Sequence, residues 1–479
     1  MPHFDAVTIG LLVAFATCQG LYFLTFLVEI YLFSRPVNWV RVSEARNIPE
    51  REYPNIVLFY PVLNELESTM RTTMLSISRM KYPSTLSRVI ALPNWNDTAT
   101  IAALRRLQGA FPFLEVEVVP PTTDPSWNVV WQAWDQNPKA YWWHEGAHAH
   151  QRDLPPKKTR QLIYGFYRSY GDAERANGVL VDYIDADSCP PPDHFLGAVA
   201  GMRHYDVLQA QNVAGNLNTS LAASWCALDH MAWDGGKYAH LSANGRHPYW
   251  VLGKGLFFRA SDLLELGSLH PWMAIEDPEV GMRFWKNGKR LGIIESPLIE
   301  EVPVTFRRAI TQRKRWVCGF FQSLGEPLDR LGFTPWEKFK AWMNFLPCMS
   351  LWINTVGLPT GAWGLWTFIS GADILPLPLV GVCLFNVVAF TVTMSALYAR
   401  TWLRTGLVLG SLRGRVAYML RVNPLSVAIW WAVWLIPLAI GLWMYLRDRS
   451  RVWERTEKIN ANKVLIEQDF GGLAHQRAA

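Results

Sequence analysis

The sequence is poor in three features that would each indicate a particular class of protein: paired cysteines, charge of one sign, and repeats. Its 6 cysteines are scattered without any C-x-x-C pair, so neither a zinc ribbon nor a disulfide framework is indicated, and a reducing compartment fits. The net charge of +6 comes from 46 basic and 40 acidic residues, an excess too small to indicate a nucleic-acid partner. It does suit an anionic membrane surface or a phosphate-bearing ligand. No internal repeat or low-complexity tract is present, which argues against solenoid and low-complexity classes.

Apolar residues are abundant but unevenly distributed. They make up 50% of the 479 residues, yet the mean hydropathy is only +0.05. A chain of this length exceeds one ordinary core, and the balance predicts a water-soluble part joined to a membrane part. The 24 tryptophans do not decide further, because indole sits well at the bilayer interface and also stacks on sugar rings.

The first apolar run covers residues 7–33 and is long enough to span the hydrocarbon core. No Lys or Arg precedes it, whereas Arg35, Arg41 and Arg46 follow. The positive-inside rule therefore places the N-terminus outside and the next domain in the cytoplasm. We expect a transmembrane helix over residues 1–34 of an integral protein of a bacterial inner (plasma) membrane.

A second membrane region is expected over residues 342–447. Segments 342–369 and 375–399 should cross outward and return, because their connection carries no basic residue and arginines follow the second. The run over 424–446 either crosses the bilayer or, with Pro437 in its middle, forms a re-entrant or interfacial segment. The polar tail over 448–479 is expected in the cytoplasm.

Between the membrane regions, residues 51–310 alternate strand and helix patterns. β-rich runs over 55–62, 88–94, 114–120 and 178–188 are separated by stretches with helical spacing. This order predicts an α/β domain with a mostly parallel sheet covered on both faces, in which ligands bind beyond the carboxyl ends of the strands.

Asp185 and Asp187 stand at the end of the fourth of these runs. Two hard oxygen ligands at the mouth of a site suit Mg²⁺ or Mn²⁺, which neutralises a diphosphate. The alternative is that these acids cap a helix starting near Asp193 or lie in a solvated turn. D-x-D alone does not decide between the two interpretations.

Two further clusters follow along the chain. Glu276 and Asp277 precede a helical stretch, where they either complement the helix dipole or supply a general base for a hydroxyl acceptor. The cluster TQRKRW begins a segment over 311–341 that is expected at the membrane interface. It is either a basic amphipathic anchor or a donor site in which arginine binds phosphate and tryptophan contacts a sugar.

D-x-D, E-D and Q-x-x-R-W, in this order and between membrane helices, resemble the family 2 glycosyltransferases. The likeness is to the membrane-embedded processive branch that includes cellulose, chitin and hyaluronan synthases. It implies a cytoplasmic GT-A (Rossmann-like) domain and an inverting hexosyltransferase that moves sugar from a nucleotide-sugar, expected to be UDP-linked. The acceptor would be a growing polysaccharide or glycolipid, extended through a β-linkage. Membrane lipid and a homo-oligomer or secretion partner are expected, since few membrane segments are available for a full channel.

The resemblance also implies roles for single residues. Asp277, with Glu276 beside it, would be the catalytic base, while Asp185 would contact the nucleotide and, with Asp187, the Mg²⁺ or Mn²⁺ ion. The other implied nucleotide-sugar contacts are Glu65, Asp97, Lys158, Gln312, Arg313, Arg315 and Trp316. Asp97 lies in LPNWNDT, which departs from the family's acidic pair and leaves the base and the sugar undetermined.

Three other functions stay open at this point: single-sugar transfer to a lipid carrier, a non-catalytic sugar-binding scaffold, and a zinc metalloprotease. The protease interpretation rests on HEGAHAH, residues 144–150, which contains H-E-x-x-H. Gly146 and the nearby Pro155 and Pro156 disfavour a metal-binding helix, so an insertion loop is expected there.

Overall fold

The computed structural model describes residues 5–234, 236–241, 245–372, 374–447 and 458–468, with the side chains of 345–350 excepted. Within these residues, the centre is an eight-stranded sheet in the order β1-β8-β6-β7-β5-β2-β3-β4. β7 is antiparallel to both neighbours and the other pairs are parallel. The predicted α/β class with a mostly parallel sheet is confirmed. The strands are β1 Trp39–Val40, β2 Asn55–Val62, β3 Ser87–Pro93, β4 Leu114–Val116, β5 Val179–Tyr183, β6 Val207–Ala214, β7 Leu256–Arg259 and β8 Leu291–Glu300.

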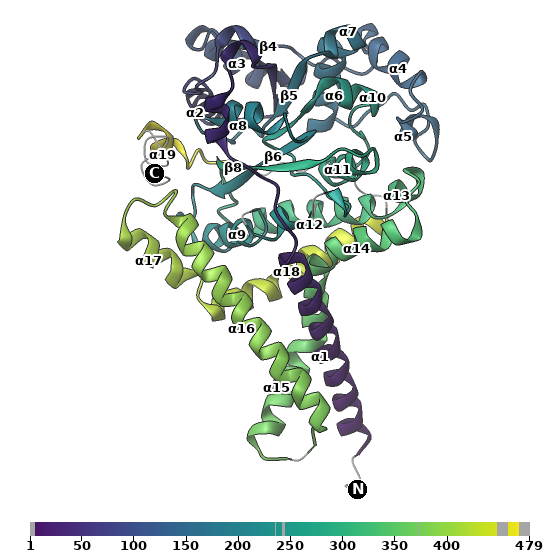
Figure 1. The fold of residues 1–479 in the computed structure, drawn as a ribbon, viewed down its shortest axis with the longest axis vertical. Coiled ribbons are helices and arrows are strands. Elements are labelled where there is room, and N and C mark those ends of the chain that lie inside the picture. Colours follow the sequence, from purple (N-terminus) through teal and green to yellow (C-terminus); the bar gives the residue numbers. More distant parts are fainter. Residues whose placement is uncertain (1–4, 235, 242–244, 373, 448–457, 469–479) are drawn as a thin grey trace.

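Helices surround the sheet and continue below it (Figure 1). Those of the sheet domain are α2 Glu67–Ile77, α3 Thr98–Ala110, α4 Asn128–Asp135, α5 Tyr141–His144, α6 Lys158–Tyr170, α7 Ala173–Ala176, α8 His194–Gly201, α10 Ala260–Glu265 and α11 Asp277–Lys286. The others are α1 Ala6–Phe33, α9 Leu221–Ala232, α12 Phe306–Ser323, α13 Glu326–Arg330, α14 Pro335–Met349, α15 Asn354–Ile369, α16 Leu377–Thr405, α17 Leu412–Arg421, α18 Pro424–Leu446 and α19 Lys463–Glu467.

Strand β2 shows how the sheet domain is held together. Because side chains alternate across a strand, Val57 and Phe59 enter one buried core and Ile56 and Leu58 enter another. The first core includes α6 and the second includes α2, α3 and α8. A strand buried on both faces belongs in the middle of a three-layer domain.

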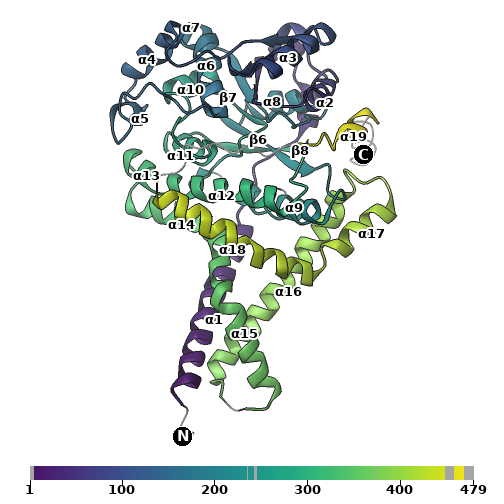
Figure 2. The same cartoon turned by 180° about the vertical axis from the view of Figure 1, so that it is seen from behind.

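Helix α1 and the pair α15–α16, which belong to the expected membrane regions, project away from the sheet domain (Figures 1 and 2). Among the described residues, three helices are long and apolar enough to cross a bilayer: α1, α16 and α18. The segment expected to cross over 342–369 consists of the end of α14, a 3₁₀ helix over Ser350–Ile353 and α15. Helix α14 carries charged side chains that bind the sheet domain, as in the Glu337–Lys286 ion pair at 2.7 Å.

Helix α18 runs crosswise to α1 beneath the sheet domain and packs along α12 (Figures 1 and 2). The two helices approach so closely that a Cβ atom on Gly441 would lie 2.7 Å from the backbone oxygen of Lys314. Of the predicted tail over 448–479, residues 458–468 are described and lie against the sheet domain. The rest lies outside the described residues, as do residues 1–4 of the N-terminal segment.

Candidate functional site

A cavity of about 1780 Å³ lies between the ends of β2 and β5 and the helices α12 and α18. The sequence-predicted residues that line it are Glu65, Lys158, Asp185, Asp187, Glu276, Asp277, Gln312, Arg315 and Trp316. They come from strand ends, helix starts and α12, so the sheet topology brings distant motifs to one place. Asp97 and Arg313 lie outside this lining.

Lys158 and Asp185 occupy the centre of the lining. Lys158 is the first residue of α6, and its Nζ lies 2.6 Å from Asp185 Oδ1 and 3.8 Å from Glu276 Oε1. Burial alone would raise the pKa of Asp185, but Lys158, Lys254 and Lys458 together hold that pKa below its usual value. Asp185 is therefore kept ionised.

Asp277 opens α11, with Glu276 at the N-cap position. Burial and the neighbouring Glu276 carboxylate raise the pKa of Asp277 to about 7, against the opposing effect of Lys158. Thr159 Oγ1 donates to Glu276 Oε2 at 3.2 Å and so fixes the orientation of that carboxylate. A carboxyl group with a pKa near neutrality can take up and release a proton under ordinary conditions.

Asp187 forms an ion pair with a residue of the C-terminal tail. Lys458 Nζ lies 2.6 Å from Asp187 Oδ2, which also accepts the backbone N–H of Glu301 at 3.0 Å. The backbone N–H groups of Ile459 and Ala461 donate to the Glu301 carboxylate at 2.6 and 2.8 Å. No local pattern in the sequence indicates this contact, because Lys458 and Asp187 are 271 residues apart.

The two aspartates suit a divalent metal that a ligand helps to hold. Among the described residues, side-chain hydrogen bonds use Oδ1 of Asp185 and Oδ2 of Asp187, which leaves a second oxygen on each for a cation. No group of three or more His, Cys, Asp or Glu side chains able to hold a metal gathers within the described part of the chain. Two carboxylates completed by diphosphate oxygens are a common way to bind Mg²⁺.

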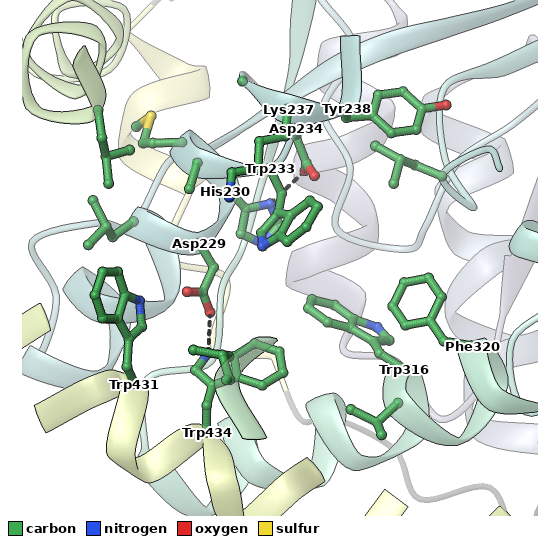
Figure 3. A pocket seen from close by; sticks show the side chains of 18 of the residues that line it. Asp229, His230, Trp233, Asp234, Lys237, Tyr238, Trp316, Phe320, Trp431 and Trp434 are labelled. Carbon is green, nitrogen blue, oxygen red and sulfur yellow. Dashed lines mark hydrogen bonds and ion pairs between the residues drawn. The ribbon is translucent and has the colours of Figure 1, made fainter. Parts of the chain in front are cut away.

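Arg313 is fully buried away from the cavity, which corrects the expectation that it faces the donor. Its guanidinium donates to Asp229 Oδ2 at 3.0 and 2.5 Å. The same carboxylate accepts the indole N–H of Trp430 at 2.9 Å. It also accepts that of Trp434 at 3.2 Å (Figure 3). Arg313 therefore ties α12 to α9 and α18.

Helical spacing groups three residues of Q-x-x-R-W but does not by itself separate Arg313 from them. On α12, Gln312, Arg315 and Trp316 stand at positions i, i+3 and i+4 and share one face, which lines the cavity. Arg313 stands three positions before Trp316, and its guanidinium lies 5.5 Å from the centre of that ring. The Asp229 carboxylate, which the sequence does not indicate, turns Arg313 away from the cavity.

Asp97 has a structural place instead of the expected contact with the nucleotide. It is the N-cap of α3, where its carboxylate accepts the backbone N–H of Thr100 at 3.2 Å and that of Asn64 at 2.5 Å. These bonds fix the start of α3 against the turn after β2. In LPNWNDT, the Asp97–Thr98 pair is a helix-start signal, which the family resemblance led us to interpret as a nucleotide contact.

HEGAHAH forms the last residue of the short helix α5 followed by a loop, as predicted. His148 stacks on Trp272 with ring centroids 4.3 Å apart, and Glu145 forms an ion pair with Arg330. His144 Nε2 lies 3.1 Å from the backbone oxygen of Asn137. His144 and His148 do not share a helix, so this stretch lacks the geometry of a zinc protease.

The sequence interpretation missed a polar group between the predicted site and the membrane helices. His230 Nδ1 lies 2.9 Å from Asp234 Oδ2. Lys254 forms an ion pair with Glu300, and Arg404 of α16 donates to the Gln211 side chain. His230, Asp234, Lys254 and Arg404 line the cavity. Lys254 stands between two glycines in the sequence, whereas the others lack a local pattern.

Comparisons with known proteins agree with this geometry. A family model described as Glycosyl transferase family group 2 matches residues 180–446. A probable glycosyltransferase of Sulfolobus acidocaldarius is 26% identical over 190 residues, which are 37% of this chain and 38% of that protein. The match thus spans well under half the length of this relative.

A solved structure is similar over nearly the whole chain. It is the mannosyltransferase PcManGT from Pyrobaculum calidifontis in complex with GDP-Man and Mn²⁺. The TM-score is 0.51 at 16% identity, covering 93% of this chain and 99% of that one. At this identity the similarity concerns the fold alone, and it confirms the predicted GT-A-like architecture.

Proposed function

The chain belongs to glycosyl transferase family group 2 and is a nucleotide-sugar transferase, and we propose that it acts by inversion. It moves a sugar from a nucleotide diphosphate to a hydroxyl group of a polysaccharide or glycolipid acceptor and forms a β-linkage. One observation carries this proposal. A single cavity holds Asp185, kept ionised by Lys158, and Asp277, whose pKa is raised to about 7.

The residues of the chain divide the reaction between them. Lys158 and Arg315 face the donor diphosphate and stabilise the charge that it gains as the bond to the sugar breaks. Asp277 accepts the proton of the acceptor hydroxyl. The hydroxyl oxygen attacks the anomeric carbon of the sugar from the side opposite the departing diphosphate. The proton passes to solvent before the next cycle. An α-linked donor then gives a β-linked product.

Asp185 and Asp187 would hold Mg²⁺ or Mn²⁺, which supplies positive charge against the diphosphate when bound. Glu65, at the turn after β2, lines the same cavity and would contact the nucleotide. The nucleotide expected from the sequence is UDP. The complex of the Pyrobaculum enzyme with GDP-Man and Mn²⁺ supports testing GDP-sugars as well.

The membrane arrangement belongs to the proposal. Helix α1 and the pair α15–α16 would anchor the enzyme in a bilayer while α18 lies at the interface. The sheet domain and residues 458–468 then share one side, which the positive-inside rule makes the cytoplasm. The order of the three motifs supports the processive branch, and the length distribution of the product would distinguish it from single-sugar transfer.

The test is nucleotide release by purified protein in nanodiscs, with a panel of UDP- and GDP-sugars and either Mg²⁺ or Mn²⁺. We expect turnover with one donor and a loss of about 10³-fold in kcat for Asp277→Asn, because the base is removed. Glu174→Gln, an exposed acid on α7, is the matched control and should keep the wild-type rate. Full turnover by Asp277→Asn, or a folded protein that binds no donor, would overturn the proposal.

A further inference from the structure

The cavity is larger than a nucleotide-sugar requires. Its volume of about 1780 Å³ exceeds the roughly 300–1,000 Å³ of an ordinary small-molecule site. It runs from the donor carboxylates to the helices of the membrane region without interruption. Room for a second substrate therefore lies on the membrane side of Asp277.

The membrane end of the cavity is apolar and open. Phe26 of α1, Leu358 and Leu365 of α15 and Phe390 of α16 line it. The last three are 50%, 61% and 43% exposed, so no other part of the described chain closes this end. Side chains of this kind cannot hydrogen-bond the hydroxyls of a polysaccharide, whereas they suit hydrocarbon chains.

The end near the site is polar and aromatic. Trp233 and Trp316 line the same space, with the His230–Asp234 pair beside Trp233 (Figure 3). Indole faces stack on sugar rings, and an imidazole–carboxylate pair offers hydrogen bonds to hydroxyl groups. The cavity lining therefore changes from polar to apolar along its length, which matches the polar head and apolar chains of an amphipathic molecule.

The carboxyl groups at the polar end favour a hydroxyl-bearing head group over a phosphate. Glu276 and Asp277 line this part of the cavity. The lining also carries cations: Lys237 is paired with Glu29 and Lys254 with Glu300, whereas Arg404 donates to the uncharged Gln211 side chain and Asn212 carbonyl and Arg400 lines the cavity from α16. A general base is also useful only to a hydroxyl, because a phosphate acceptor is already ionised at neutral pH.

We infer that the acceptor is a membrane lipid with an uncharged, hydroxyl-bearing head group. Its head lies between Trp233 and Trp316 with one hydroxyl directed to Asp277, and its chains leave between α1, α15 and α16 into the bilayer. This inference rests on the proposed function and narrows the acceptor to a glycolipid.

The acceptor is tested with the donor identified by the panel, carrying a labelled sugar. Nanodiscs of phosphatidylcholine receive monoglucosyl diacylglycerol, a polyprenyl phosphate, a soluble oligosaccharide or no addition. We expect labelled lipid in the first arm only. Transfer confined to the polyprenyl phosphate or the oligosaccharide, or donor turnover without transfer, would overturn the inference and leave the proposed function intact. Failure to bind or turn over any donor would instead remove the proposed function itself.

A glycine in the lining allows a sharper test. Gly361 of α15 faces the cavity, and a Cβ added there meets no atom within 4 Å. Gly361→Leu therefore places a side chain in the space proposed for the lipid chains, and we expect the KM for the glycolipid to rise about tenfold. Donor affinity should be unchanged.

Gly381 of α16 is the matched control, since a Cβ there also meets nothing within 4 Å and the residue is exposed outside the cavity lining. Gly381→Leu should leave the KM for the lipid at the wild-type value. An equal effect of both substitutions, or none from Gly361→Leu, would contradict the proposed path of the chains.

Discussion

Asp185 and Asp277 line the same cavity and face the same lysine, yet their surroundings act on them in opposite directions. Lys158 lies 2.6 Å from Asp185 and helps to hold its pKa below the usual value. Asp277 lies beside Glu276 and has its pKa raised to about 7 by burial and that neighbour. Where the pKa values of two acids in one site are shifted in opposite directions, one acid stays charged and the other exchanges protons. In the proposed reaction, this difference supports binding by Asp185 and proton transfer to Asp277.

The largest effects should come from removing each acid in turn. Beside the loss of kcat in Asp277→Asn, we expect Asp185→Asn to weaken donor binding by about 30-fold, because a charged hydrogen-bonding group is lost. Calorimetric titration with the donor measures donor affinity in both variants. Donor affinity in Asp277→Asn should stay within about threefold of wild type, since that group meets the acceptor. Equal weakening of donor binding in both variants would contradict the division of roles.

Removing the shared lysine should raise the pKa of both acids and so slow proton transfer to Asp277. In Lys158→Gln the carboxylates lose their nearest cation, and the pKa of Asp277 should rise by about one unit or more. We expect kcat/KM at pH 7 to fall about 20-fold and to recover partly at pH 9, where Asp277 ionises again. Lys139→Gln, at an exposed ion pair with Glu265, is the control. A loss that does not depend on pH would show that Lys158 acts on the donor alone.

The pH dependence of the unmodified enzyme gives the smallest and most direct measure. A raised pKa means that Asp277 is protonated below about 7 and cannot accept a proton. Activity should therefore fall with acidity, by about tenfold per pH unit below that value. The residual activity of Asp277→Asn should lack this slope. A profile that stays flat from pH 5 to 8 would exclude Asp277 as the base.

The fold was largely predictable because its central strands are simple. The apolar run 55–62 is β2, Asn55–Val62, since a strand buried on both faces needs no alternation. Strand β6, Val207–Ala214, was not predicted, because Gln209, Gln211 and Asn212 interrupt its apolar pattern. Gln209 is satisfied by neighbouring backbone, donating to the Lys254 carbonyl and accepting from the Leu252 N–H. Only the assembled sheet reveals such partners.

The site was predictable where residues act from strand ends or from one helix face. Asp185 follows the end of β5 and Asp277 begins α11, and the topology brings both to the cavity; Gln312 and Trp316 share a face of α12. The contact of Lys458 with Asp187 was not predictable, because it depends on how the tail returns to the sheet domain. Sequence spacing predicts which residues are neighbours within one helix or strand. It does not predict contacts between segments that are distant in the sequence.

The Asp229 carboxylate has a consequence for how the enzyme is made. It binds Arg313 of α12 and Trp434 of α18, and Trp434 leaves the ribosome 205 residues after Asp229. The helix that carries Gln312, Arg315 and Trp316 therefore receives its final support only when the last long apolar helix has been synthesised. In the proposed reaction, a chain that lacks α18 would therefore hold its donor site without this support.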